Sequence, residues 1–116
     1  MFRIVIANHD ELMNARLARS LESHDAVQVV GVATNGLDAL DLVWECQPNV
    51  VVVGPVRPPM GGRVLLRLVQ EARPRALLVA LEEPAHESRC VPAEAAACLR
   101  YDGVDHLRLV PAQGRR

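Results

Sequence analysis

The chain has 116 residues, half of them hydrophobic, and a formal net charge of −1. A domain of this length buries roughly two thirds of the surface that its unfolded chain exposes, so a single folded domain is expected. No apolar run approaches the ~20 residues of a membrane-spanning helix, and the apolar stretch near the start is too short for a signal peptide. We therefore expect no membrane segment and a cytoplasmic protein.

The basic residues and the cysteines argue against a nucleic-acid-binding domain and against a domain held together by disulfides or a structural metal. The basic residues, all of them arginines, are dispersed along the chain, so we expect no direct nucleic-acid binding by this domain. The three cysteines, Cys46, Cys90 and Cys98, are widely spaced and form no C-x-x-C pair. Disulfide scaffolding and a structural metal are therefore not expected, and the cysteines are interpreted as free thiols.

The first part of the chain alternates short apolar runs with segments of helical period. In chain order the pattern predicts strand 3–7, helix 11–23, strand 27–33, helix 37–46, strand 49–53, helix 62–72 and strand 75–81. The apolar positions predict the buried faces of the helices: Leu12, Ala15, Leu17, Ala18 and Leu21 in the first; Leu37, Leu40, Val43 and Trp44 in the second; Val64, Leu65, Leu68 and Val69 in the third.

The pattern weakens after Leu81. A polar stretch with Pro84 favours a loop, residues 92–103 favour a helix with Pro92 in its first turn, and residues 105–110 favour a fifth strand. Alternating strands and helices indicate a doubly wound parallel sheet, here with strand order 2-1-3-4-5. Its last covering helix is missing or lies outside the chain, so apolar surface is expected to be left for a partner.

The strands and turns resemble the receiver domain of two-component response regulators, over the chain to Pro111. "VVGVATNGLDAL" (residues 29–40) is similar to the family's second strand and following turn, and "QPNVVVVGPVRPPMGG" (residues 47–62) to its third strand and loop. Pro58, Met60 and Gly62 fall where that loop usually has proline, methionine and glycine. The resemblance implies a flavodoxin-like fold, a receiver-like domain over residues 1–111, and a tail or linker start over 112–116.

The family's chemistry is phosphoryl transfer from a histidine kinase to an aspartate, aided by Mg²⁺, and this sequence departs from it at every position concerned. By the resemblance, the metal-binding acidic pair falls on Asn8 and His9, with Asp10 one place late, and the phosphoacceptor falls on Gly54. The hydroxyl falls on Ala80, the lysine on Val110 and the switch aromatic on Leu107. We therefore expect no phosphorylation, no metal, no cofactor and no enzymatic activity.

Two interpretations of the altered pocket stay open. Small apolar replacements favour a recess with a few polar anchors, which is the usual shape of a small-molecule site. The candidate residues of this recess are Asn8, His9, Asp10, Gly54, Pro55, Arg57, Ala80 and Val110. Alternatively, the loops collapse inward and a side chain such as Arg57 or His9 fills the space.

A second candidate surface lies near the end of the chain. In receivers the fourth helix, fifth strand and fifth helix form the dimerisation face, which the resemblance maps here onto Ala95, Ala96, Cys98, Leu99, Leu107 and Leu109. We expect a homodimer through this face. The sequence thus predicts a phosphorylation-independent receiver-like domain of an orphan response regulator that controls transcription, with DNA bound by a linked output domain. The alternative is a stand-alone interaction module that docks on a kinase or another regulator.

Overall fold

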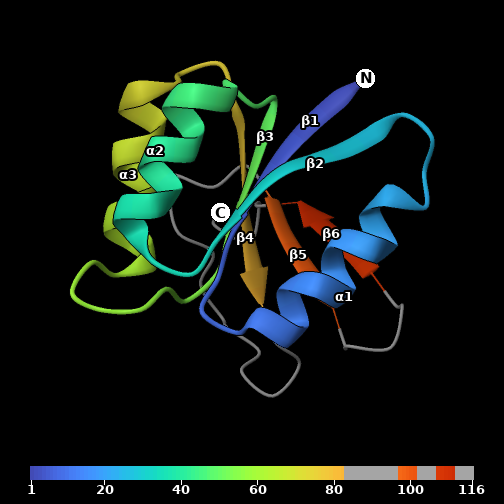
Figure 1. Cartoon of the computed structure of the whole chain (residues 1–116), viewed down its shortest axis with the longest axis horizontal. Coiled ribbons are helices and arrows are strands. Elements are labelled where there is room, and N and C mark those ends of the chain that lie inside the picture. The colour runs from blue at the N-terminus through green and yellow to red at the C-terminus, as the bar shows by residue number, and fades with distance from the viewer. Residues whose placement is uncertain (83–96, 102–106, 112–116) are drawn as a thin grey trace.

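A computed structural model describes residues 1–82, 97–101 and 107–111 of the chain. In this part strands and helices alternate as far as the fourth strand, and two strands follow (Figure 1). The elements are β1 Phe2–Ala7, α1 Glu11–Glu22, β2 Val27–Ala33, α2 Gly36–Cys46, β3 Val50–Val53, α3 Gly62–Ala72, β4 Leu77–Glu82, β5 Ala97–Tyr101 and β6 Leu107–Pro111.

The first four strands form a parallel sheet in the order β2-β1-β3-β4, as predicted for a flavodoxin-like fold. Ile4 of β1 lies opposite Val50 of β3, which in turn lies opposite Leu77 of β4. Because all four strands run the same way, their carboxyl ends meet at one edge of the sheet, where sites of such folds are usually built.

The prediction for the end of the chain was wrong in two respects. Ala97–Tyr101 is not helical but forms β5, which pairs in parallel with β4. The expected fifth strand is observed as β6, which pairs antiparallel with β5 rather than parallel with β4. By pairing with the open edge of β4, residues 97–100 satisfy backbone groups that would otherwise be unpaired, and this tertiary pairing overrides the predicted helix preference. The predicted residues Ala95 and Ala96 lie outside the described part.

Helices cover both faces of the sheet. α2 and α3 lie side by side on one face and α1 lies on the other (Figure 1). Val51 and Val53 of β3 belong to the core under α2 and α3, whereas Val52 belongs to the core under α1. A strand buried on both faces needs apolar residues at consecutive positions, which explains the run of four valines.

The helices expose some of the apolar residues that were expected to be buried. On α1 the side chain of Leu12 is 63% exposed, while the polar Asn14 is buried beside Leu17. On α2 Leu37 and Trp44 are exposed, and on α3 Val64 is exposed while Leu66 is buried. The buried faces are thus rotated relative to the predicted ones.

Apolar surface was expected to be left where the last covering helix is missing. On the sheet face under α1, Val79, Leu81 and Leu99 are buried at the centre. Exposed apolar side chains on this face are found at the amino ends of the strands, where Phe2 and Leu77 lie. No helix in residues 1–82, nor any in the two later described segments, is long and apolar enough to cross a membrane.

Candidate functional site

The candidate site lies where β1 and β3 end. Asn8 directly follows β1 and Gly54 directly follows β3. The backbone N–H of Asn8 donates to the carbonyl of Ala33 at the end of β2 (3.0 Å), and that of Gly54 donates to the carbonyl of Ala7 (2.8 Å). The two bonds place Asn8 between the ends of the neighbouring strands, at the centre of the carboxyl edge.

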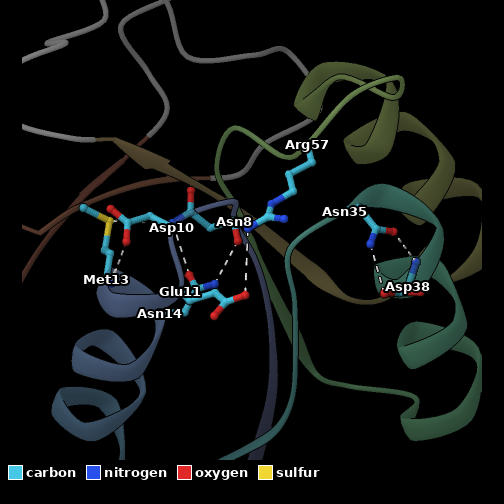
Figure 2. Close-up of polar contacts among 8 residues, drawn as sticks. All are labelled: Asn8, Asp10, Glu11, Met13, Asn14, Asn35, Asp38 and Arg57. Atoms are coloured by element: carbon cyan, nitrogen blue, oxygen red, sulfur yellow. Dashed lines mark hydrogen bonds and ion pairs between the residues drawn. The ribbon is translucent and has the colours of Figure 1, made fainter.

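Asn8 is tied to the first helix by a pair of amide contacts (Figure 2). Its Nδ2 donates to Oδ1 of Asn14 (3.1 Å), and Nδ2 of Asn14 donates back to the backbone carbonyl of Asn8 (2.8 Å). Both side chains are buried. Buried amides are normally hydrogen-bonded, and this reciprocal pair explains why a polar residue occupies the inner face of α1.

Asn8 also fills the space next to Gly54. Its side-chain Oδ1 is buried and has no hydrogen-bond partner among the residues that the structure describes. A Cβ added to Gly54 would lie 2.5 Å from this oxygen, which is closer than any real contact of that kind. The asparagine in this orientation and a side chain at position 54 therefore exclude each other. Position 54 holds glycine, and the amide of Asn8 occupies the place where the resemblance puts a phosphoacceptor side chain.

His9 and Asp10 contact the loop after β3 and the first turn of α1, respectively. The backbone N–H of His9 donates to the carbonyl of Pro55 (2.8 Å), and its ring Nδ1 lies 3.0 Å from the same oxygen. The carboxylate of Asp10 accepts from the backbone N–H of Met13 (3.1 Å) and caps α1. A capping carboxylate satisfies a donor that the helix itself leaves unpaired. Neither residue fills the space beside Gly54.

Arg57 lies on the loop after β3, and its side chain extends toward Glu11 of α1 (Figure 2). Its guanidinium is 3.8 Å from the carboxylate of Glu11, and both side chains are largely exposed (Figure 2). Its backbone N–H donates to the carbonyl of Thr34 (3.0 Å), which joins this loop to the end of β2. Ion pairs this exposed contribute little to stability, so the backbone bond is the firmer link. Pro55 is exposed on the same loop.

Of the remaining residues that were predicted for the recess and for the association face, those that the structure describes lie on three different strands. Ala80 is buried on β4, opposite Val53, and so belongs to the edge that holds Gly54. Val110 lies on β6, opposite Cys98 of β5, so one strand separates it from Ala80. In the expected association face Leu99 is buried, and Leu107 and Leu109 lie on β6, opposite Tyr101 and Leu99.

The residues present do not fit the magnesium ion that the resemblance implies. A hard divalent cation prefers several carboxylate or carbonyl oxygens. Here the carboxylate of Asp10 is used as a helix cap, the amide of Asn8 is buried against Gly54, and position 54 has no side chain. Within the described ranges no group of three or more His, Cys, Asp or Glu side chains is arranged to hold a metal ion.

A hollow of about 380 Å³ lies between α1 and the end of β2. Its lining residues are Glu11, Asn14, Ala15, Ala18, Val32 and Thr34. The sequence reasoning missed this hollow and the buried Asn14 that joins it to Asn8. The signals in the sequence were an asparagine among apolar positions of the first helix and two alanines one turn apart.

Comparisons with known proteins agree with the fold. No protein-family model matches the chain. The chain is 30% identical over 99 residues to the response regulator GacA of Pseudomonas viridiflava, covering 83% of this chain and 46% of that protein. It is 31% identical over 77 residues to protein-glutamate methylesterase/protein-glutamine glutaminase 3 of Geobacter sulfurreducens, covering 66% of this chain and 21% of that protein.

A solved structure has a similar fold. The response regulator domain of Thermotoga maritima CheB matches with a TM-score of 0.70 at 21% identity, covering 81% of this chain and 69% of that one. The chain spans less than half the length of the two relatives above. The shared 2-1-3-4 sheet and the sequence matches together show that the chain carries a receiver (REC) domain of response regulators.

Proposed function

We propose that this receiver domain regulates without being phosphorylated. It acts in the cytoplasm as a module of an orphan response regulator that controls transcription, with DNA bound by a linked output domain. Its signal is carried by association with another chain, by binding of a small effector, or by both. The matched region makes up 46% of the response regulator GacA of Pseudomonas viridiflava. This likeness supports the presence of further domains.

The contact between Asn8 and Gly54 carries this proposal. Phosphoryl transfer needs a nucleophile in line with the phosphorus atom, and metal or cationic groups for the developing charge. Position 54 has no nucleophile, and the neighbouring amide leaves no room for one to be added. The carboxylate of Asp10 is committed to its helix. These observations support a switch that does not depend on phosphate.

Intact-mass spectrometry after incubation with acetyl phosphate and Mg²⁺ tests the proposal. We expect the mass of the chain to stay unchanged, while a receiver domain with an intact aspartate, treated in parallel, gains one phosphoryl group. Stoichiometric addition of a phosphoryl group to any residue of this chain, His9 and Asp10 included, would contradict the proposal.

Effector binding is tested separately, by the melting temperature in the presence of candidate metabolites. A ligand that binds only the folded chain raises this temperature, and the stabilisation grows with the logarithm of one plus the ratio of the ligand concentration to Kd. The fluorescence of Trp44 is a poor reporter here, because that side chain is exposed on α2, on the face of the sheet opposite to α1. If no metabolite shifts the transition, association is the remaining route.

The alternative is a stand-alone module that docks on a kinase or another regulator. The reading frame beyond Arg116 separates the two. A following segment with helix-turn-helix pattern supports the transcription regulator, and its absence from the native gene supports the docking module.

A further inference from the structure

The outer surfaces of α2 and α3 carry exposed apolar side chains. The side chains of Leu37 and Trp44 on α2 are 68% and 65% exposed, and that of Val64 on α3 is 50% exposed. Exposed apolar residues are common singly, but large aromatic side chains are enriched at interfaces. Three exposed apolar side chains, one of them a tryptophan, lie on two adjacent helices and therefore mark this surface as a place of contact.

The geometry of α2 places its exposed residues on one stripe. Leu37 and Trp44 are seven residues apart, nearly two helical turns, and so share one side of the helix. Another side of α2 faces β2, because Leu42 lies against Gly31 and Sγ of Cys46 lies 3.8 Å from the carbonyl of Val30. The stripe thus faces away from the edge strand and toward the side of α2 on which α3 packs (Figure 1).

The two helices carry opposite charge. α2 has three acidic residues, Asp38, Asp41 and Glu45, and no basic residue. α3 has Arg63 and Arg67 in its first half and Glu71 in its last turn. All six side chains are exposed. One helix therefore offers an acidic surface with apolar anchors, and its neighbour offers a mainly basic surface with an apolar anchor.

We propose that these surfaces form an interface between two copies of this chain, in which α2 of one copy lies against α3 of the other. A twofold axis that runs parallel to the two helices, in the plane of contact, produces this pairing twice and closes the dimer. The copy itself supplies the complementary charge, so no further partner is required. This interface uses another face than the one that was predicted near the carboxyl end.

Charge selects this arrangement over the other twofold packing of the same surfaces. An axis perpendicular to the helices would place α2 antiparallel on α2, so that the acidic residues Asp38, Asp41 and Glu45 of one copy would face the same acidic residues of the other. Juxtaposed like charges cost several kcal/mol at an interface, whereas opposite charges favour and orient the encounter. The α2-to-α3 pairing joins acidic to basic side chains on both sides of the axis.

Sedimentation equilibrium of the full chain and of two charge variants tests the interface. We expect the wild-type chain to dimerise at micromolar concentration, and more weakly at high salt because screening acts on exposed charges. Asp41→Lys alone and Arg63→Glu alone should each weaken the dimer at least about tenfold, since each places like charges together twice. A mixture of the two variants should recover the dimer, because both pairs of that heterodimer are again opposite in charge.

Apolar variants and a matched control complete the experiment. Trp44→Ala should weaken the dimer about tenfold or more, as expected for a buried aromatic anchor. Leu12→Ala, which removes a similarly exposed side chain from α1, should leave the association unchanged. A wild-type chain that stays monomeric would overturn the proposal. So would a dimer that is insensitive to Asp41→Lys and Arg63→Glu, since it would then use another face.

Discussion

Replacing Gly54 by alanine tests how tightly Asn8 fills the altered pocket. The new Cβ would lie 2.5 Å from Oδ1 of Asn8, 3.1 Å from its Cγ and 3.3 Å from Cδ2 of Leu81. Asn8 cannot retreat freely, because its amide is held by Asn14. Overpacking of a close-packed site costs typically 1–3 kcal/mol, and we expect Gly54→Ala to lower the free energy of unfolding by about 2 kcal/mol.

Urea denaturation followed by circular dichroism measures this loss, which corresponds to a fall in melting temperature of roughly 10 °C for a domain of this size. The same substitution is then made in an Asn8→Ala background. There the added methyl group meets no amide, so its cost should fall by about 1 kcal/mol or more. Gly61→Ala is the matched control, because no atom lies within 4 Å of a Cβ at that position.

The reasoning would be refuted by a Gly54→Ala variant as stable as the wild-type chain. It would equally be refuted by the same cost in both backgrounds, because the contact with Asn8 would then not be its source. A large cost for Gly61→Ala would indicate that glycine is needed for the backbone rather than for the space beside it.

Three further substitutions probe the site, each measured by urea denaturation. Asp10→Ala removes the oxygen that caps the N–H of Met13 and should cost about 1 kcal/mol, whereas Asp10→Asn should retain most of the stability. Asn14→Ala leaves buried polar groups of Asn8 without partners and should cost about 2–3 kcal/mol; a neutral result would contradict the buried amide pair. Arg57→Ala breaks only an exposed ion pair and should change stability by less than about 0.5 kcal/mol, and a larger loss would show that the arginine has a structural role.

The order of the first four strands and the missing chemistry were predictable from the sequence. Mainly apolar runs of four to seven residues, separated by helical segments, indicate a parallel sheet because its strands are buried on both faces. The carboxylates that the resemblance requires are absent from positions 8, 9 and 54 whatever the detailed packing. Both statements depend only on residue type and spacing along the chain.

The exposed faces of the helices were predicted less well. Leu12, Leu37 and Trp44 fit an apolar period, yet each is more than half exposed. Periodicity defines a face only to within one helical position or so, and the angle at which a helix meets the sheet decides which flank is buried. On α1 this angle brings Asn14 inward, where its partner comes from the end of β1.

What the sequence determined by itself was local: which segments form the parallel sheet, and that glycine follows the third strand. Only the tertiary structure decided that Asn8 fills the space above that glycine, because the contact joins residues from two strands and one helix. The same holds for β5, whose residues were predicted to be helical but form a strand because the open edge of β4 offers hydrogen bonds. Contacts between distant segments have no signature in a single chain's pattern, since they depend on what the folded neighbours leave unpaired or unfilled.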